Sequence, residues 1–351
     1  MKPYGLMADV HFHNWSAFSN VSERGVNSRL ESLIKEVYRC AKEVKSAGGD
    51  TLVIAGDIFH VRGSVAPSVL NPVTDCFREL KHEGIEVFML AGNHDLEGKG
   101  SNRVSSAITA LEDSCTVISE HGSTVIDANT ILIPWFEDLA ELKEELVLLS
   151  ETPYARSQDV VIHAPIDGVI KGLPNSGLDP EWLGNLGFKR VFAGHYHNHI
   201  AFPCQVYSIG ALAHHTWSDV GHKAGFLIVS EYDVKWFKSH LPEFIDIIPA
   251  EMSESDVELL VEGNYARAKL SSSKVSDVND MRAWLTGSGA VGVIIQSVKE
   301  AVTERDGSVS KSYSSGATLE VSISEYVRSL SIPHSDLVLD GCQKILAEAG
   351  V

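Results

Sequence analysis

The chain has 351 residues, 44% of them hydrophobic and 22% charged, which excludes collagen-like, coiled-coil and disordered classes and favours two to three domains or one large domain with an appendage. Its formal net charge of −18 argues against a broad basic surface for nucleic acid, so positive charge for phosphate binding must come from a local source such as bound metal. The five scattered cysteines without a CxxC pair, and the lack of a signal peptide or a membrane-length apolar run, predict a cytoplasmic protein with reduced thiols and no membrane partner.

The first part of the chain alternates predicted strands with predicted helices. Leu30, Leu33, Val37 and Val44 follow the helical period, and Pro67 lies at a first-turn position of a second helix. The predicted elements are strand 4–10, helix 30–44, strand 51–55, helix 67–82 and strand 86–90. This order predicts a sheet covered by helices, and ligands of such sheets gather at the carboxyl ends of the strands.

The middle of the chain continues with short strands and two further helices. A charged helix over 138–149 is expected to present its Glu and Lys residues to solvent. The other predicted elements are helix 103–111 and strands 116–118, 130–133, 159–162 and 190–193. After these, short strands at 200–202, 205–209, 225–231 and 234–237 predict a β-meander.

A change of pattern near residue 249 predicts a domain boundary. Residues 1–249 would form the main domain, and residues 256–351 a small α+β domain that caps it or binds a partner. The predicted elements of the small domain are strand 266–270, helix 275–284, strand 290–298, a Ser-rich stretch at 308–315 and a final helix at 335–348. The final helix packs either against its own core or against a partner chain.

One sequence pattern recurs at the ends of these strands: an apolar run, a glycine and then a residue that can bind metal. It occurs at Gly56-Asp57, at Gly92-Asn93 and at Gly194-His195. A single Gly-Asp pair is typical of an ordinary turn, but repetition favours a common site. Carboxylate, imidazole and amide oxygen suit manganese, iron or zinc, and the absence of cysteine disfavours a structural zinc site. The candidates that follow predicted strands are Asp9, His11, Asp57, Asn93, His94, His163, His195 and His197.

The five motifs that contain these residues resemble those of the calcineurin-like metallophosphoesterases. The motifs are Asp9-x-His11, Gly56-Asp57-x-x-His60, Gly92-Asn93-His94-Asp95, His163 and Gly194-His195-x-His197. The resemblance implies an α/β fold, namely a two-sheet αββα sandwich. It also implies two divalent metal ions, one on Asp9, His11, Asp57 and His197 and the other on Asp57, Asn93, His163 and His195, with Asp57 bridging the pair.

Such a metal pair accounts for phosphoester hydrolysis. Two ions about 3.5 to 4 Å apart can clamp a phosphoryl group and acidify a bridging water, which then attacks as hydroxide. Manganese is the expected metal, with Fe2+ or Zn2+ as alternatives. His94 is expected to donate to a phosphate oxygen or to protonate the leaving group, and Asp95 to orient His94.

The residues after Asp57 bear on the substrate. Protein phosphatases of this superfamily carry Gly-Asp-x-x-Asp-Arg-Gly, whereas this chain has Gly56-Asp57-Ile-Phe-His60, which is similar to the SbcD-like DNA-repair nucleases of the meiotic-recombination-eleven family. That resemblance implies that His60 helps to position DNA. It also implies a small capping domain and an attachment site for an SbcC-type, SMC-like ATPase, for which residues 256–351 have a suitable length.

The sequence therefore predicts a manganese-dependent DNA nuclease, chiefly an exonuclease with endonuclease activity as an option, in DNA repair, recombination or phage DNA processing. A homodimer is a further option. Two other functions stay open: a small-molecule phosphodiesterase that cleaves cyclic nucleotides, for which an acidic surface is no handicap, and a non-catalytic scaffold, against which the complete ligand set argues. His60 could also be a solvated loop residue. Trp15 and Trp217 are expected either in the core or as surfaces on which bases stack. Four more histidines are expected in loops or behind the ligands, namely His13, His214, His215 and His222.

Overall fold

The computed structural model describes residues 1–98, 105–127, 129–271, 278–298, 327 and 338–342. The chain divides into two compact units, Met1–Lys299 and Glu300–Val351. Of the second unit, residues 338–342 are helical, within the helix predicted for 335–348, and the rest of that prediction lies outside the described residues, as does the Ser-rich stretch at 308–315. None of the helices in the described ranges carries an apolar stretch of bilayer-spanning length.

The first sheet of the larger unit has six strands in the order β12-β11-β1-β2-β3-β4. Strands β1 to β4 run parallel, and the β11–β12 hairpin joins the β1 edge in antiparallel orientation. Continuous apolar runs such as Thr51–Ala55 form these strands because both faces of the sheet are covered. The strands are β1 Tyr4–Met7, β2 Thr51–Ala55, β3 Glu86–Leu90, β4 Thr116–Ile118, β11 Gly225–Val229 and β12 Val234–Lys238.

The second sheet also has six strands, in the order β5-β6-β7-β8-β10-β9. Its centre, β6-β7-β8-β10, is parallel, and antiparallel hairpin partners close both edges. The strands are β5 Thr124–Asp127, β6 Thr130–Ile133, β7 Asp159–His163, β8 Arg190–Gly194, β9 Ile200–Phe202 and β10 Val206–Ser208.

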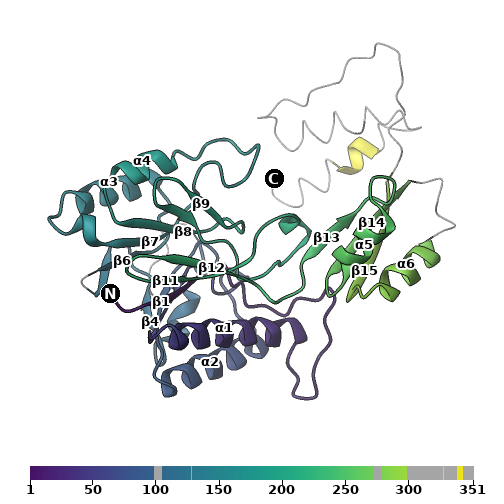
Figure 1. Ribbon diagram of the computed structural model, residues 1–351, viewed down its shortest axis with the longest axis horizontal. Coiled ribbons are helices and arrows are strands. Elements are labelled where there is room, and N and C mark those ends of the chain that lie inside the picture. The colour runs from purple at the N-terminus through teal and green to yellow at the C-terminus, as the bar shows by residue number, and fades with distance from the viewer. Residues whose placement is uncertain (99–104, 128, 272–277, 299–326, 328–337, 343–351) are drawn as a thin grey trace, which may run out of the picture. The chain divides into compact units, whose positions relative to one another are not determined.

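The two sheets pack face to face, with helices on their outer sides (Figure 1). Leu6 and Val53 of the first sheet share one buried cluster with Val161 and Phe192 of the second. Helices α1 (Ser28–Ser46) and α2 (Pro67–His82) pack on the first sheet, and α3 (Leu139–Ser150) and α4 (Pro180–Asn185) on the second. The layers are therefore α, β, β and α, as predicted.

Several local predictions need correction. The strands from residue 200 onward do not form one meander, because β9–β10 and β11–β12 are two hairpins that close the edges of different sheets. The predicted helix 103–111 is a short 3-10 helix, Ala107–Leu111, where it is described. Strand β5 and helix α4 were not predicted, since neither is long enough to show a period.

A third sheet of three parallel strands, β13-β14-β15, follows. Helices α5 and α6 pack on it around Val257, Ala266 and Leu285. The elements are β13 Phe244–Ile247, α5 Glu254–Val261, β14 Tyr265–Ser271, α6 Val278–Gly287 and β15 Gly292–Val298. Because β13 precedes residue 249, one strand of this sheet comes from the predicted main domain. The division into domains 1–249 and 256–351 stays a prediction.

Candidate metal centre

All seven predicted metal ligands lie at or just beyond the carboxyl ends of parallel strands. Two backbone bonds join the loops that follow β1 and β2: Asp9 N–H donates to Gly56 O at 3.0 Å, and His11 N–H to Asp57 O at 2.9 Å. Since the two sheets face each other, these loops and those after β7 and β8 meet at one edge of the sandwich. By strand, the ligands are Asp9 and His11 after β1, Asp57 after β2, Asn93 after β3, His163 at the end of β7, and His195 and His197 after β8.

The glycines of the recurring pattern make room for ligands from neighbouring strands. A Cβ atom at Gly92 would collide with the Asp57 carboxylate, and one at Gly56 would collide with the His163 ring. Four ligands also adopt the left-handed backbone region that non-glycine residues rarely occupy. Their φ angles are 50° for Asp9, 48° for His11, 53° for Asp57 and 107° for His195. The backbone is thus specialised for bringing these side chains together.

The first ligand group consists of Asp9, His11 and His197, whose donor atoms all lie within 4.8 Å of one another. His11 Nε2 is 3.2 Å from His197 Nε2 and 3.7 Å from Asp57 Oδ2. The other ring nitrogen of His197, Nδ1, lies 2.8 Å from Asp219 Oδ1, so Asp219 fixes which nitrogen faces the group.

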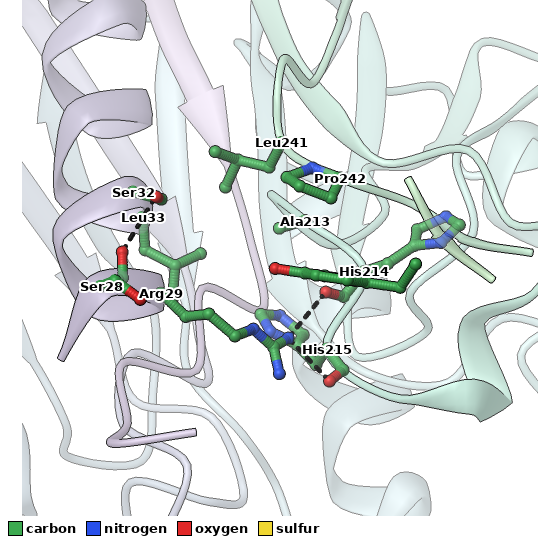
Figure 2. Close-up of a pocket in the computed structure, with 10 residues that line it drawn as sticks. Ser28, Arg29, Ser32, Leu33, Ala213, His214, His215, Leu241 and Pro242 are labelled. Atoms are coloured by element: carbon green, nitrogen blue, oxygen red, sulfur yellow. Dashed lines mark hydrogen bonds between the residues drawn. The ribbon is translucent and has the colours of Figure 1, made fainter. Parts of the chain in front are cut away.

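Loop 214–219 supports this first group from behind. His215 Nε2 lies 2.9 Å from the carbonyl oxygen of Asp9, and because a carbonyl only accepts, Nε2 carries the hydrogen. Asp219 accepts from the backbone of His215 at 2.8 Å and of Thr216 at 2.9 Å. Arg29 in turn donates to the carbonyl oxygens of His214 and His215, as Figure 2 shows.

The second ligand group consists of Asp57, Asn93, His163 and His195. Asn93 Oδ1 lies 3.2 Å from His163 Nε2 and 3.1 Å from His195 Nδ1, and His163 Nε2 is 3.5 Å from Asp57 Oδ1. His163 Nδ1 donates to the carbonyl oxygen of Ala55 at 2.8 Å. Each carboxylate oxygen of Asp57 thus lies near a different histidine, Oδ2 near His11 and Oδ1 near His163.

The donor atoms of both groups fit divalent metal ions. With Nδ1 of His163 hydrogen-bonded to Ala55, the neutral ring turns a lone pair at Nε2 toward the oxygens of Asp57 and Asn93, which are acceptors as well. Acceptors that face one another in a buried site need a positive charge between them. Carboxylate, imidazole and amide oxygen are ligands that manganese, iron and zinc share.

The pKa values of the buried side chains at this site also indicate a need for positive charge. Burial raises the pKa of Asp9 to about 6 and, together with the charge of Asp57, that of Asp95 to about 7. Burial lowers the pKa of His195 to about 3. For His197, burial opposes the charged form, but the hydrogen bond to Asp219 and the charge of Asp9 outweigh it and raise the pKa to about 9. Without a cation, Asp9, Asp95 and His197 therefore keep their protons to a higher pH than usual, whereas His195 loses its proton at a lower pH.

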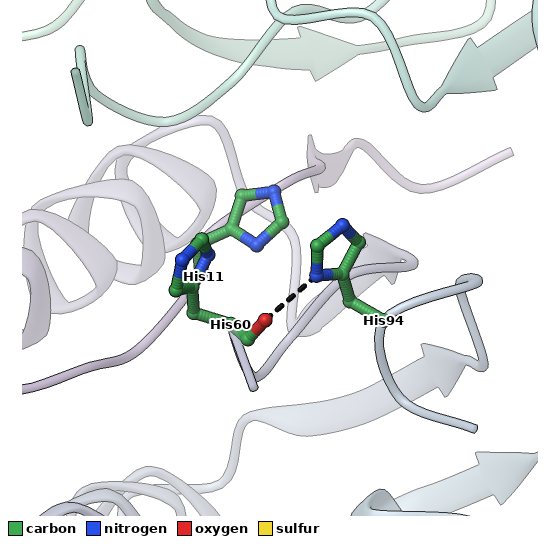
Figure 3. A group of neighbouring side chains, drawn as sticks. All are labelled: His11, His60 and His94. Carbon is green, nitrogen blue, oxygen red and sulfur yellow. Dashed lines mark hydrogen bonds between the residues drawn. The ribbon is translucent and has the colours of Figure 1, made fainter. Parts of the chain in front are cut away.

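His60 and His94 lie beside His11 of the first group (Figure 3). His94 Nδ1 donates to the carbonyl oxygen of His60 at 2.6 Å, and the backbone N–H of His94 donates to Asp57 Oδ1 at 2.8 Å. The rings of His60 and His94 are stacked at 5.6 Å, and each lies edge-on to His11, at 5.2 and 4.9 Å. These contacts leave Nε2 of His94 as the ring atom available to a substrate.

Asp95 contacts the backbone and not the His94 ring. Its buried carboxylate accepts from Phe59 N–H at 2.9 Å, Gly92 N–H at 2.9 Å and Ile58 N–H at 3.2 Å. It therefore joins the loops after β2 and β3, and it acts on His94 only through the loop backbone. The atom that contacts the His94 ring is the carbonyl oxygen of His60, and the expected orientation of His94 by Asp95 stays a prediction.

The remaining aromatic residues near the site pack within the protein. Trp15 is stacked on His215 at 5.4 Å and lies 4.4 Å from His60, so its ring belongs to the wall of the site. Trp217 packs against Arg267 at 4.5 Å and Phe244 at 4.7 Å. The other extra histidines also lie behind or beside the ligands: His13 contacts His60, His214 bonds to the carbonyl oxygen of His222, and His222 lies 3.8 Å from Asp219.

Two supporting residues were missed in the sequence. Asp219 completes a capping box with Thr216, and the spacing Thr216-x-x-Asp219 was a usable signal for it. Trp135 stacks on His195 at 5.2 Å, and only its position two residues after strand β6 could have suggested a place near the site.

Comparison with known proteins shows the family to which the chain belongs. A family model described as calcineurin-like phosphoesterase matches residues 2–199, which include every predicted ligand. The chain is 28% identical over 189 residues to "Exonuclease subunit 1" of Enterobacteria phage T4, covering 52% of this chain and 53% of that protein. It is 35% identical over 107 residues to "DNA double-strand break repair protein Mre11" of Methanopyrus kandleri, covering 30% of this chain and 21% of that protein.

The match with these relatives is partial, because the chain spans about half the length of the phage protein and about a fifth of the archaeal one. Among solved structures, a dimetal phosphatase from Danio rerio covers 67% of this chain and 96% of its own, at 12% identity and a TM-score of 0.44. The predicted fold and family are confirmed, and the chain belongs to the calcineurin-like phosphoesterase family.

Proposed function

We propose that the protein is a manganese-dependent nuclease that hydrolyses phosphodiester bonds in DNA. The observation that carries this proposal is the convergence of two ligand groups on one carboxylate, Asp57, with His60 and His94 beside them. The names of the two relatives, an exonuclease subunit and a DNA double-strand break repair protein, support DNA as the substrate.

Each ligand group would hold one metal ion. Asp9, His11 and His197 would bind the first, the side chains of the second group would bind the other, and Asp57 would serve both. Bound divalent ions would supply the charge that stabilises phosphoryl oxygens and lowers the pKa of an attacking water. The carboxylate, imidazole and amide donors suit manganese, with iron or zinc as alternatives.

The chain's own acid would be His94. Its Nδ1–H remains on the carbonyl oxygen of His60, so a proton for the leaving oxygen would come from Nε2 of the doubly protonated ring. His60 would position the DNA strand next to it. The expected signature is that His60→Ser lowers DNA cleavage more than hydrolysis of a bis-aryl phosphodiester, and equal losses on both substrates would contradict this role.

The proposal extends to partners. With a net charge of −18, the chain would hold DNA largely through its metals and through a partner, for which an SbcC-type, SMC-like ATPase is the candidate. Residues 256–351 would form the capping and partner-binding region, and the protein could act as a homodimer. Its activity would be chiefly exonucleolytic, with endonuclease activity as an option, in DNA repair or phage DNA processing.

A four-substrate assay tests the proposal. Metal-stripped protein is reloaded with Mn2+ and given linear duplex DNA, a bis-aryl phosphodiester, a cyclic nucleotide and a phosphomonoester. We expect release of nucleotides from DNA, turnover of the small diester and little turnover of the monoester. Turnover of the cyclic nucleotide without DNA cleavage would instead identify a small-molecule phosphodiesterase. Two bound metals without any turnover would identify a scaffold.

A further inference from the structure

Arg29, the second residue of α1, is buried at 8% exposure, and the charge of Asp219 favours its charged form without forming an ion pair with it. Among the described residues no carboxylate forms an ion pair with it, whereas the other fully buried arginine of this sandwich, Arg190, holds Asp159 through two bonds of 2.7 Å. The Arg29 guanidinium donates to three backbone carbonyl oxygens instead: His215 at 2.9 Å, His214 at 3.3 Å and Ala17 at 3.4 Å. A buried cation is costly, so its placement here calls for a function.

Three aromatic rings hold the guanidinium in place. Its central carbon lies 5.2 Å from the Trp15 ring, 5.4 Å from Phe244 and 5.6 Å from Tyr265, distances at which cation–π attraction is effective. Phe244 and Tyr265 belong to the third sheet. The guanidinium is thus fixed where α1, the loop before α1 and the third sheet meet.

The carbonyl groups that Arg29 binds belong to the loop that supports the first ligand group. From this loop His215 donates to the carbonyl oxygen of Asp9, and Asp219 holds Nδ1 of His197. Among the described residues, the imidazoles of the second group have no such connection: His163 Nδ1 donates to the carbonyl oxygen of Ala55, and His195 Nδ1 lies 3.1 Å from Asn93 Oδ1. Arg29 therefore reaches two ligands, both in the first group.

We propose that Arg29 is a positioning residue for the first metal site. By fixing the carbonyl groups of His214 and His215, it holds loop 214–219 at the distance at which His215 and Asp219 orient Asp9 and His197. This inference rests on the proposed metal centre. Arg29 would stabilise the ligands of the first site and not those of the second.

A pocket beside Arg29 offers a way to test this chemically. It has a volume of about 100 Å³, and Ser28, Ser32, Leu33, Leu241 and Pro242 are among its lining residues (Figure 2). Truncation by Arg29→Ala would enlarge this space toward the carbonyl groups of loop 214–219. A free guanidinium ion could then occupy the position of the lost side chain.

Mn2+ binding isotherms of the full-length chain test the inference. Arg29→Met keeps much of the side-chain volume but removes the donors, and Arg29→Lys keeps the charge with a single donor nitrogen. Lys45→Met is the matched control, since Lys45 also ties α1 to a backbone carbonyl, that of Glu83 at 2.6 Å, at the far end of the helix. Circular dichroism checks that each variant is folded.

The expected result is two sites in the wild type and in Lys45→Met. In Arg29→Met, one site should weaken about 10- to 100-fold, as when a group that orients a metal ligand is lost, while the other stays unchanged. Arg29→Lys should be intermediate. Guanidinium ion, far below denaturing concentrations, should restore the weak site in Arg29→Ala, and ammonium ion should not.

Different failures separate the two proposals. A wild-type chain that binds fewer than two Mn2+ ions contradicts the proposed metal centre itself. Two sites in the wild type that both persist, or that weaken together, in Arg29→Met overturn the role of Arg29. If Arg29→Met does not fold, Arg29→Lys and the rescue of Arg29→Ala decide the question by the same criterion.

Discussion

The two ligand groups are built in different ways. The second group is fixed by the strands themselves, since His163 is the last residue of β7 and bonds to the carbonyl oxygen of Ala55, the last residue of β2. The first group depends on loop 214–219, which supplies Asp219 to His197 and His215 to Asp9. Residues fixed by sheet strands are placed by the folding of the core itself. Residues fixed by a loop can lose their positions, and with them metal affinity, while the core stays folded.

Asp57 lies between the two groups, with one carboxylate oxygen near His11 and the other near His163, so its loss should have the largest effect. Asp57→Asn removes the negative charge between the groups, and we expect hydrolysis of a small phosphodiester to fall by more than about 100-fold, beyond the usual cost of losing a supporting residue. Metal content should fall at both sites. Asp50→Asn, at the opposite end of β2 in an exposed pair with Lys2, is the control and should change neither. Retention of both metals in Asp57→Asn would contradict the shared role.

Asp219→Asn should lower metal affinity at the first group and leave the second group unchanged. The change weakens the hydrogen bond that orients His197, so affinity at the first site should drop about 10- to 100-fold while the second site keeps its affinity. Equilibrium dialysis with Mn2+ measures both sites. Asp233→Asn, an exposed change in the β11–β12 turn, serves as the control. A parallel loss at both sites would show that the loop supports the whole centre.

Trp135→Phe should affect the second group, and more weakly. Trp135 stacks on His195, and an aromatic contact of this kind contributes about 0.5 to 1.5 kcal/mol. We expect second-site affinity to fall about 2- to 10-fold, with the first site unchanged. Trp182→Phe in α4 is the matched control, because that ring packs on the outer core of the second sheet. A loss of Mn2+ affinity at the first site alone would contradict the assignment of Trp135 to the second group.

The pH dependence of stability should reveal the pairing of His197 with Asp219. The folded pKa of His197 is raised from 6.5 to about 9, so its contribution is complete below about pH 6.5 and is lost as the pH rises to about 9. Thermal unfolding of metal-free protein should therefore show a midpoint that falls by a few degrees over this range.

Two comparisons isolate this histidine. Asp219→Asn should flatten the fall, and saturating Mn2+ should do so as well, because a bound imidazole has no proton to lose. The buried thiols of Cys76 and Cys115, whose pKa values are raised to about 12, add a fall of the same sign in both proteins and cancel in the difference. Equal slopes for wild type and Asp219→Asn would rule out the pairing as the cause.

The sequence could predict which residues the structure brings together in the two groups, because each is marked locally by a strand, a glycine or a second metal-binding residue. Asp57 and Asn93 follow apolar runs that are buried in the structure as well. Apart from Asp219, whose capping box with Thr216 is a local mark, the supporting residues carry none. Arg29 lies at the start of an ordinary amphipathic helix, and its partners are backbone carbonyls 185 and 186 residues away.

The errors in the fold prediction have a related cause. The sequence of a short strand indicates its alternation of side chains but not the strand with which it pairs. For this reason β9–β10 and β11–β12 were predicted as one meander, although they close different sheets. Strand β13 was missed next to the proposed boundary because its pairing partner, β14, begins only at Tyr265. Pairing over such separations depends on the packed sheets and not on any one segment.

The close approach of glycines to the ligands has a consequence for mutational tolerance. A side chain at Gly56 or Gly92 would displace His163 or Asp57, and one at Gly194 would strike the Ala55 carbonyl that holds His163. In a random screen for inactive variants, substitutions at these three positions should therefore appear as often as substitutions of the ligands themselves. The set of positions at which we expect this protein to tolerate no change is therefore wider than the set of proposed metal ligands.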